Sequence, residues 1–196
     1  MAAPRTTTNA RLASIPRTAA QLRIIIAALD LFTEHGVSGT SLQMIADAIG
    51  VTKAAVYHQY RTKEEIVLAV AEFGLVPLEM ALDAAEAERS RAAALEVLLG
   101  EMIALAVENR RMVSALQRDP VVARLLADHA PFRELMDRQD RVLIGGHEGA
   151  EARLRAAMVW AAIVGGVGHP LVADVDGATL RSQMLDLALR FLAGPD

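Results

Sequence analysis

A repeated helix-start motif in the first third of the chain constrains the fold most strongly. The segments Thr18-Ala-Ala-Gln21, Thr40-Ser-Leu-Gln43 and Thr62-Lys-Glu-Glu65 each place a threonine three residues before Gln or Glu. This is the form of a capping box, in which the two side chains satisfy free N–H groups at a helix start. The sequence therefore predicts three helix starts close together in the chain.

Apolar residues after each motif recur at helical spacing. Gly36 is expected to end the first helix, and Gly50 to form a tight turn with positive φ between two short helices. The second of these short helices is predicted from Thr52 to Gln59, with Val51, Val56 and Tyr60 as packing residues. The apolar stripes are Leu22, Ile25, Ile26, Leu29 and Phe32, then Leu42, Ile45, Ala46 and Ile49, then Ile66, Val67 and Val70.

The rest of the chain also has helical patterns and no sustained strand alternation. Helices are expected near residues 92–108, 148–166 and 178–192, with two shorter pieces set off by Pro120 and Pro131. Pro77 marks either a kink or the start of another helix. With 53% hydrophobic but only 4% aromatic residues, the core is expected to be built from aliphatic side chains. The predicted fold class is all-α.

Charge is distributed unevenly along the chain. Residues 1–63 carry a net charge of +4 and contain both lysines, Lys53 and Lys63, whereas the remainder carries −8. A basic end on an acidic body is typical of a protein that binds a polyanion at one end.

Several functional classes find no support in the residues. The chain has no cysteine, which excludes disulfides and thiolate metal sites. His129, His147 and His169 lack metal-site spacing, and no phosphate loop or nucleophile elbow occurs. We expect no catalytic residue, metal or cofactor. The segment 1–16 has no secretory core, and the longest apolar run, 156–167, is too short to span a membrane. A cytoplasmic protein is expected.

Residues 27–36 and 40–66 resemble the N-terminal domain of the TetR family of bacterial transcriptional regulators. The similarity runs through Gly50-Val-Thr-Lys53 and Val56-Tyr-His58. Gln59 and Ala55 depart from the family pattern, where an aromatic residue or His and a small polar residue are common.

The resemblance implies a helix-turn-helix whose second helix enters the DNA major groove. Thr40 and Ser41 would bind phosphate at the start of the second helix. Thr52, Lys53, Ala54 and Ala55 would open the recognition helix against phosphate and bases. The remaining implied DNA contacts are Tyr57, His58 and Lys63.

The family layout also implies three regions: a flexible basic arm at 1–16, a DNA-binding domain at 17–76 and a helical regulatory domain at 77–196. The arm is either a disordered tail or a minor-groove contact. Because the run 156–167 is apolar around its circumference, it is expected to be buried. The resemblance implies that it is buried in a homodimer interface, and the alternative is a core helix of a monomer. The expected interface residues are Trp160, Ala161, Val164, Leu180, Met184, Leu187 and Phe191. The expected effector-cavity residues are Met80, Met102, Met112, Phe132 and Met136.

The resulting hypothesis is a homodimeric repressor of a palindromic operator, released by a small hydrophobic effector. The same architecture could also activate transcription. Two further hypotheses compete with a regulator: a helical carrier of hydrophobic molecules without specific DNA binding, and a helical enzyme with a dispersed site. The charge distribution and the extended resemblance favour the regulator.

Overall fold

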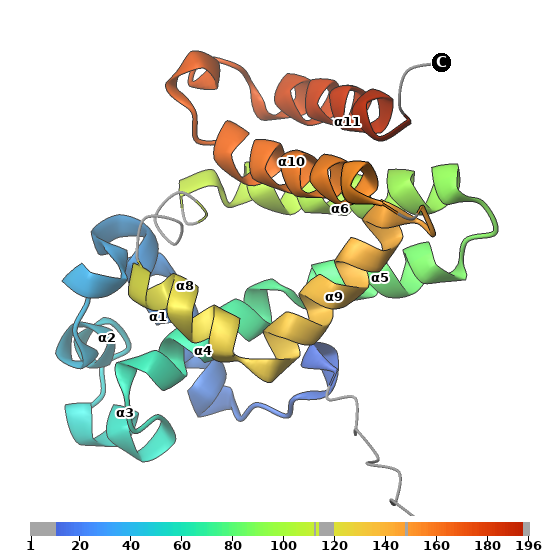
Figure 1. Ribbon diagram of the computed structural model, residues 1–196. Coiled ribbons are helices and arrows are strands. Elements are labelled where there is room, and N and C mark those ends of the chain that lie inside the picture. Colours follow the sequence, from blue (N-terminus) through green and yellow to red (C-terminus); the bar gives the residue numbers. More distant parts are fainter. Residues whose placement is uncertain (1–10, 112, 114–119, 148, 194–196) are drawn as a thin grey trace, which may run out of the picture.

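The computed structural model describes residues 11–111, 113, 120–147 and 149–193, and regular structure in these ranges is helical throughout (Figure 1). The first group of elements is η1 (Leu12–Ser14), α1 (Ala19–Gly39), α2 (Leu42–Ala48), α3 (Lys53–Gln59) and α4 (Lys63–Gly74). The second group is α5 (Val76–Ala87), α6 (Arg91–Glu108), α8 (Pro120–Asp128), α9 (Ala130–Ile144), α10 (Ala150–Gly166), η2 (Pro170–Val172) and α11 (Gly177–Ala193). The all-α prediction is confirmed. No helix within the described ranges is long and apolar enough to cross a membrane.

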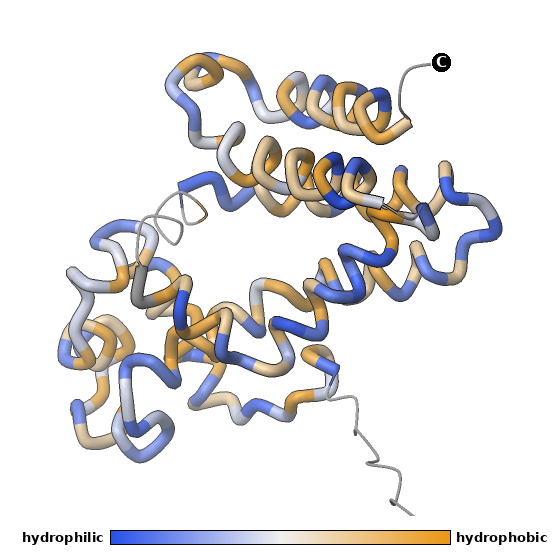
Figure 2. The backbone as a smooth tube through the Cα atoms, in the orientation of Figure 1, coloured by the Kyte–Doolittle hydropathy of each residue, from blue (hydrophilic) through white to orange (hydrophobic). Residues whose placement is uncertain are grey.

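Two hydrophobic cores organise the molecule. The smaller core joins α1 to α4 and includes the fully buried Ile25, Ile45, Val56 and Ile66. Val122 of α8 also belongs to this core, so α8 packs on the N-terminal helices. The larger core lies among α5, α6, α9, α10 and α11. Figure 2 shows that apolar residues, in orange, are frequent along α10 and α11.

The predicted capping motifs form three different arrangements. At Thr18 both reciprocal bonds of the capping box are present. At Thr62 the hydroxyl accepts from the Glu65 N–H, but the Glu65 carboxylate accepts from the Arg61 N–H instead of the Thr62 N–H. At the second motif the cap is Ser41, which accepts from the Met44 N–H, so the helix starts one residue later than predicted.

Residues 11–16 correct the expectation of a flexible arm. Leu12 is buried in the larger core, and the Glu79 carboxylate of α5 accepts hydrogen bonds from the backbone N–H groups of Leu12 and Ala13 at 3.0 and 2.9 Å. Arg11 also pairs with Asp83 at 2.7 Å. A buried carboxylate that receives two N–H groups holds this segment in place. The minor-groove contact was predicted for the whole arm, of which residues 1–10 lie outside the described ranges, and it stays a prediction.

The helix breaks follow from glycine and proline chemistry. Gly36, at φ 73°, interrupts the helical backbone inside α1, and Gly145, at φ 62°, ends α9 in the left-handed conformation. Pro77 lies in the first turn of α5, where its missing N–H leaves no hydrogen bond unmade. Pro77 therefore starts a helix and does not kink one.

Candidate DNA-binding surface and effector cavity

The turn between α2 and α3 is held by backbone geometry and one buried side chain. Gly50 adopts φ 68°, and the Val51 N–H donates to the Ala46 carbonyl at 3.0 Å. Thr52 caps α3 by accepting from the Ala55 N–H. Val56 is fully buried and Tyr60 nearly so, which confirms their predicted packing roles. One face of α3 is thereby fixed inward, and the opposite face projects into solvent.

The exposed face of α3 carries five of the residues expected to contact DNA: Lys53, Ala54, Ala55, Tyr57 and His58. The Lys53 ammonium lies 5.8 Å from the centroid of the Tyr57 ring, so the cation and the phenol occupy the same side of the helix. No residue of α3 is acidic. Thr52 and Ser41 are also exposed, at the starts of α3 and α2. The surface offers one cation, hydroxyl donors and two methyl groups, which suits phosphate and thymine-methyl contacts.

Thr40 and Lys63 form hydrogen bonds within the protein itself. Thr40 is only 2% exposed, and its hydroxyl is directed at the carbonyls of Leu31 and Gly36 at 3.2 and 2.8 Å. The Lys63 ammonium donates to the carbonyls of Val37 and Thr40 at 2.9 and 3.2 Å. Both side chains therefore bond backbone carbonyls around the end of α1. Their polar groups are bonded to backbone carbonyls in this structure, and their predicted phosphate contacts stay a prediction.

An apolar cavity of about 420 Å³ lies between the two cores. Its wall comprises Val70, Ala71 and Gly74 of α4, the start of α5, the second half of α6, one side of α8, and parts of α9 and α10. This volume lies in the range of small-molecule sites. Because α4 belongs to the core that carries α3, the cavity directly contacts the N-terminal domain.

The predicted cavity residues are placed unevenly. Met102 and Phe132 line the cavity. Met80 does not, because it is 63% exposed on the outer side of α5. Met136 packs against the larger core and is not part of the cavity wall. Met112 lies outside the described residues. Helical spacing in the sequence could not have shown that α4 and α8 line the cavity. The cavity wall is formed by six helices, and each helix contributes only a few residues to it.

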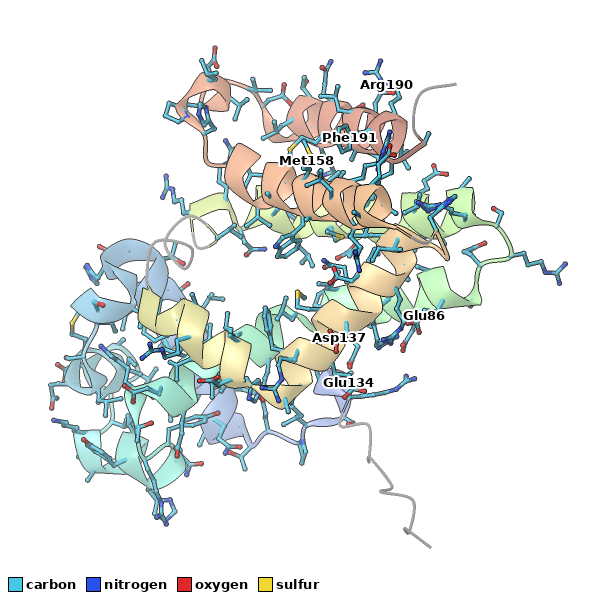
Figure 3. All side chains as sticks on the ribbon, viewed as in Figure 1. Glu86, Glu134, Asp137, Met158, Arg190 and Phe191 are labelled. Carbon is cyan, nitrogen blue, oxygen red and sulfur yellow. The ribbon has the colours of Figure 1, made fainter. Side chains whose placement is uncertain are left out.

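The outer side of α10 and α11 is a second apolar groove. Met158, Leu187 and Phe191 are exposed there, and Met184 and Leu180 form its floor (Figure 3). Within one protomer only one side of α10 is buried, through Ala156, Val159 and Ile163, and the burial of the other side in a homodimer interface stays a prediction. An apolar face left in solvent on a helix pair is a candidate protein interface.

Two of the expected interface residues face the other way. Trp160 and Val164 line the cavity and not the outer groove. The physical reason is the helical period: residues four apart share a face, and these two share theirs with the buried Ala156. Ala161 is exposed, and Leu180, Met184, Leu187 and Phe191 belong to the groove as expected.

One polar cluster ties the N-terminal domain to the regulatory helices. Glu72 of α4 accepts from the Arg17 guanidinium at 3.0 Å and from the His129 ring at 2.9 Å. The three side chains are only 10%, 16% and 20% exposed for Arg17, Glu72 and His129. Arg17 precedes α1, and His129 joins α8 to α9. Burial of the Tyr60 side chain raises the pKa of its phenol, and the positive charge of Arg17 partly offsets this rise.

The helix-turn-helix segment is similar in sequence to known regulatory proteins. Residues 24–70 match the sequence model described as "Bacterial regulatory proteins, tetR family". Over 58 residues the chain is 45% identical to the HTH-type transcriptional regulator SrpR of Pseudomonas putida. That segment is 30% of this chain and 27% of SrpR, so this relative informs the N-terminal domain alone.

Solved structures extend the similarity to the whole fold. The SmeT–triclosan complex superposes with a TM-score of 0.68 at 26% identity, covering 88% of this chain and 91% of SmeT. FadR from Bacillus subtilis in complex with stearoyl-CoA gives a TM-score of 0.67 at 19% identity, covering 86% and 97% of the two chains. The chain therefore carries a helix-turn-helix segment similar to the TetR family of bacterial regulatory proteins, and it shares its overall fold with SmeT and FadR.

Proposed function

We propose that this chain is a ligand-responsive DNA-binding transcriptional regulator that acts as a repressor. The observation that carries the proposal is the exposed face of α3, where Lys53, Tyr57 and His58 project from a helix fixed by buried Val56. Such a helix enters the major groove, while hydroxyl and ammonium groups bind the backbone. Ser41 and Thr52 supply the hydroxyl donors, and Ala54 and Ala55 allow close approach to bases.

The proposed DNA-binding form is a homodimer built on the outer groove of α10 and α11. Two copies of an exposed apolar helix pair bury each other in a symmetric contact. A two-fold axis there brings two copies of α3 to one face of DNA, matching a palindromic operator with half-sites about one helical turn apart. The groove residues Met158, Leu187 and Phe191 supply the apolar surface for this contact.

The proposed effector is a small hydrophobic molecule bound in the cavity. It would change DNA affinity because Val70, Ala71 and Gly74 of α4 form part of the cavity wall. An effector shifts the equilibrium only by its differential affinity for the DNA-binding and released forms. A cavity that fits the effector better after α4 moves supplies that difference. Triclosan in SmeT and stearoyl-CoA in FadR are ligands of structures with this fold.

Selection of DNA from a genomic pool on the purified chain tests the proposal. We expect enrichment of one palindromic sequence, bound by the wild type and lost in the variant Tyr57→Ala. Leu171→Ala is the matched control, since Leu171 is 84% exposed and distant in sequence from α3. Recovery of no specific sequence, with a folded dimer, would contradict DNA regulation and favour a carrier of hydrophobic molecules.

A further inference from the structure

The chemistry of the cavity wall narrows the class of molecule that it can bind. Among the described residues that line the cavity, none carries a charge. The wall is aliphatic and aromatic, with two side chains that hold polar atoms: the Asn109 carboxamide of the α6 end and the Trp160 indole of α10. Sites of this kind owe orientation and specificity to their few polar groups.

An ionised ligand would be strongly disfavoured in this wall. A carboxylate or ammonium that is buried against this wall loses its hydration and finds no opposite charge among the described lining residues. An uncharged molecule of the same shape loses far less. The same wall therefore separates neutral from ionised molecules of similar size by affinity, with the neutral form favoured.

Asn109 is placed to recognise one polar group on such a molecule. Its Nδ2 donates to the Leu105 carbonyl at 2.9 Å, which orients the carboxamide at the end of α6. A carboxamide has a second N–H and an oxygen with two acceptor sites. It can therefore accept from a hydroxyl or donate to a carbonyl. A hydrogen bond in an apolar cavity discriminates well, because an unpaired polar group there is costly.

We infer that the cavity binds an uncharged, mainly apolar molecule with one hydroxyl or carbonyl group, and that Asn109 selects this group by hydrogen bonding. Calling that molecule the effector rests on the proposed function. The binding preference does not, because it follows from the wall alone. Fatty carboxylates and cationic amphiphiles of equal size are excluded as good ligands by the same argument.

Four naphthalene probes of nearly equal shape test the inference by calorimetry on the full chain without DNA. They are naphthalene, 2-naphthol, 2-naphthoate and 2-naphthylmethylammonium. We expect 2-naphthol to bind about tenfold tighter than naphthalene, as one added hydrogen bond implies. Both ions should bind at least about a hundredfold more weakly than 2-naphthol. An ion that binds as well as 2-naphthol, or the failure of all four probes to bind, would overturn the inference.

Two substitutions of Asn109 sharpen the test. Asn109→Leu should abolish the preference for 2-naphthol while keeping naphthalene binding within about threefold of the wild type. Asn109→Asp should weaken 2-naphthoate further and strengthen the ammonium probe, because it places an anion in the wall. Met80→Leu is the control, since Met80 lies outside the cavity and should change nothing. An Asn109→Leu variant that still prefers 2-naphthol would refute the role of Asn109. DNA is absent from every arm, so these results stand apart from the genomic selection.

Discussion

Glu72 and His129 lie 57 residues apart in the chain, yet the carboxylate accepts a hydrogen bond from the imidazole ring at 2.9 Å. The contact joins α4 to the junction of α8 and α9. Both partners lie beside the cavity, since Ala71 and Leu126 form part of its wall. The hydrogen bond between Glu72 and His129 therefore links two segments that both contribute residues to the cavity wall.

Replacing Glu72 by Gln should destabilise the fold and weaken the contact between α4 and the junction of α8 and α9. Arg17, only 10% exposed, would lose its counter-charge, and an unpaired group of this kind costs about 1–3 kcal/mol. Urea unfolding measures the loss. The control Glu108→Gln removes a pair with Arg181 that is 44% and 59% exposed, and it should cost no more than about 0.5 kcal/mol. Equal losses in the two variants would show that the Glu72 cluster is an ordinary surface contact.

The same substitution should change the response to an effector. If the Glu72 cluster holds α4 in the DNA-binding position, its loss shifts the population toward the released form. Linkage then requires weaker DNA binding and tighter effector binding, each in proportion to the change in the population of the form that binds it. Titrating DNA and 2-naphthol separately against Glu72→Gln measures both. Changes of the same sign in the two affinities would contradict a coupling role.

The two lysines of the chain should affect DNA binding in different ways. Lys53 projects from α3, so Lys53→Ala should reduce the slope of log affinity against log salt by about one unit, through one lost phosphate contact. Lys63 donates to the carbonyls of Val37 and Thr40, so Lys63→Ala should leave the slope nearly unchanged and lower stability by about 1–2 kcal/mol. Binding measured over a salt series distinguishes them. A lower slope for Lys63→Ala would restore its role as a phosphate contact.

Gly145 and Gly146 form a matched pair for testing backbone strain. Both have positive φ, at 62° and 75°, so alanine at either position costs about 1–2 kcal/mol. At Gly145 a Cβ would also lie 2.6 Å from Nη1 of Arg91, whereas at Gly146 it meets nothing within 4 Å. Arg91 donates to the Leu143 carbonyl and would have to move. Thermal unfolding should therefore show a larger loss for Gly145→Ala, and equal losses would mean that Arg91 moves freely.

The sequence predicted the helices well because their determinants are local. Helix caps and breaks can be predicted from the sequence because the residues that cause them act on the backbone within a few positions. Examples are Thr18, Gly50, Pro77 and Gly145. Val56 was predicted to face inward from the helical pattern and Tyr60 to pack from the family resemblance, and the structure confirms both.

Side-chain roles that depend on distant partners were predicted poorly. Lys63 has the same charge as Lys53, and nothing near it in sequence indicates that its ammonium meets the end of α1. Trp160 was assigned to the wrong side of α10 because an apolar helix gives no polar face to set its orientation. Asn109 and Glu72 were missed for a related reason, since their surroundings come from several separate helices.

The outer groove of α10 and α11 gives a prediction about assembly. Leu187→Glu places a charge on a residue that is 57% exposed within the groove, so it should leave the protomer folded and prevent two copies from burying this face. Leu171→Glu introduces the same charge on a more exposed leucine outside the groove. Sedimentation at micromolar concentration should give a dimer for the wild type and Leu171→Glu, and a monomer for Leu187→Glu. Because two linked recognition helices bind a palindrome far more tightly than one, Leu187→Glu should also lose operator binding while α3 stays intact. A Leu187→Glu dimer would place the interface on another surface.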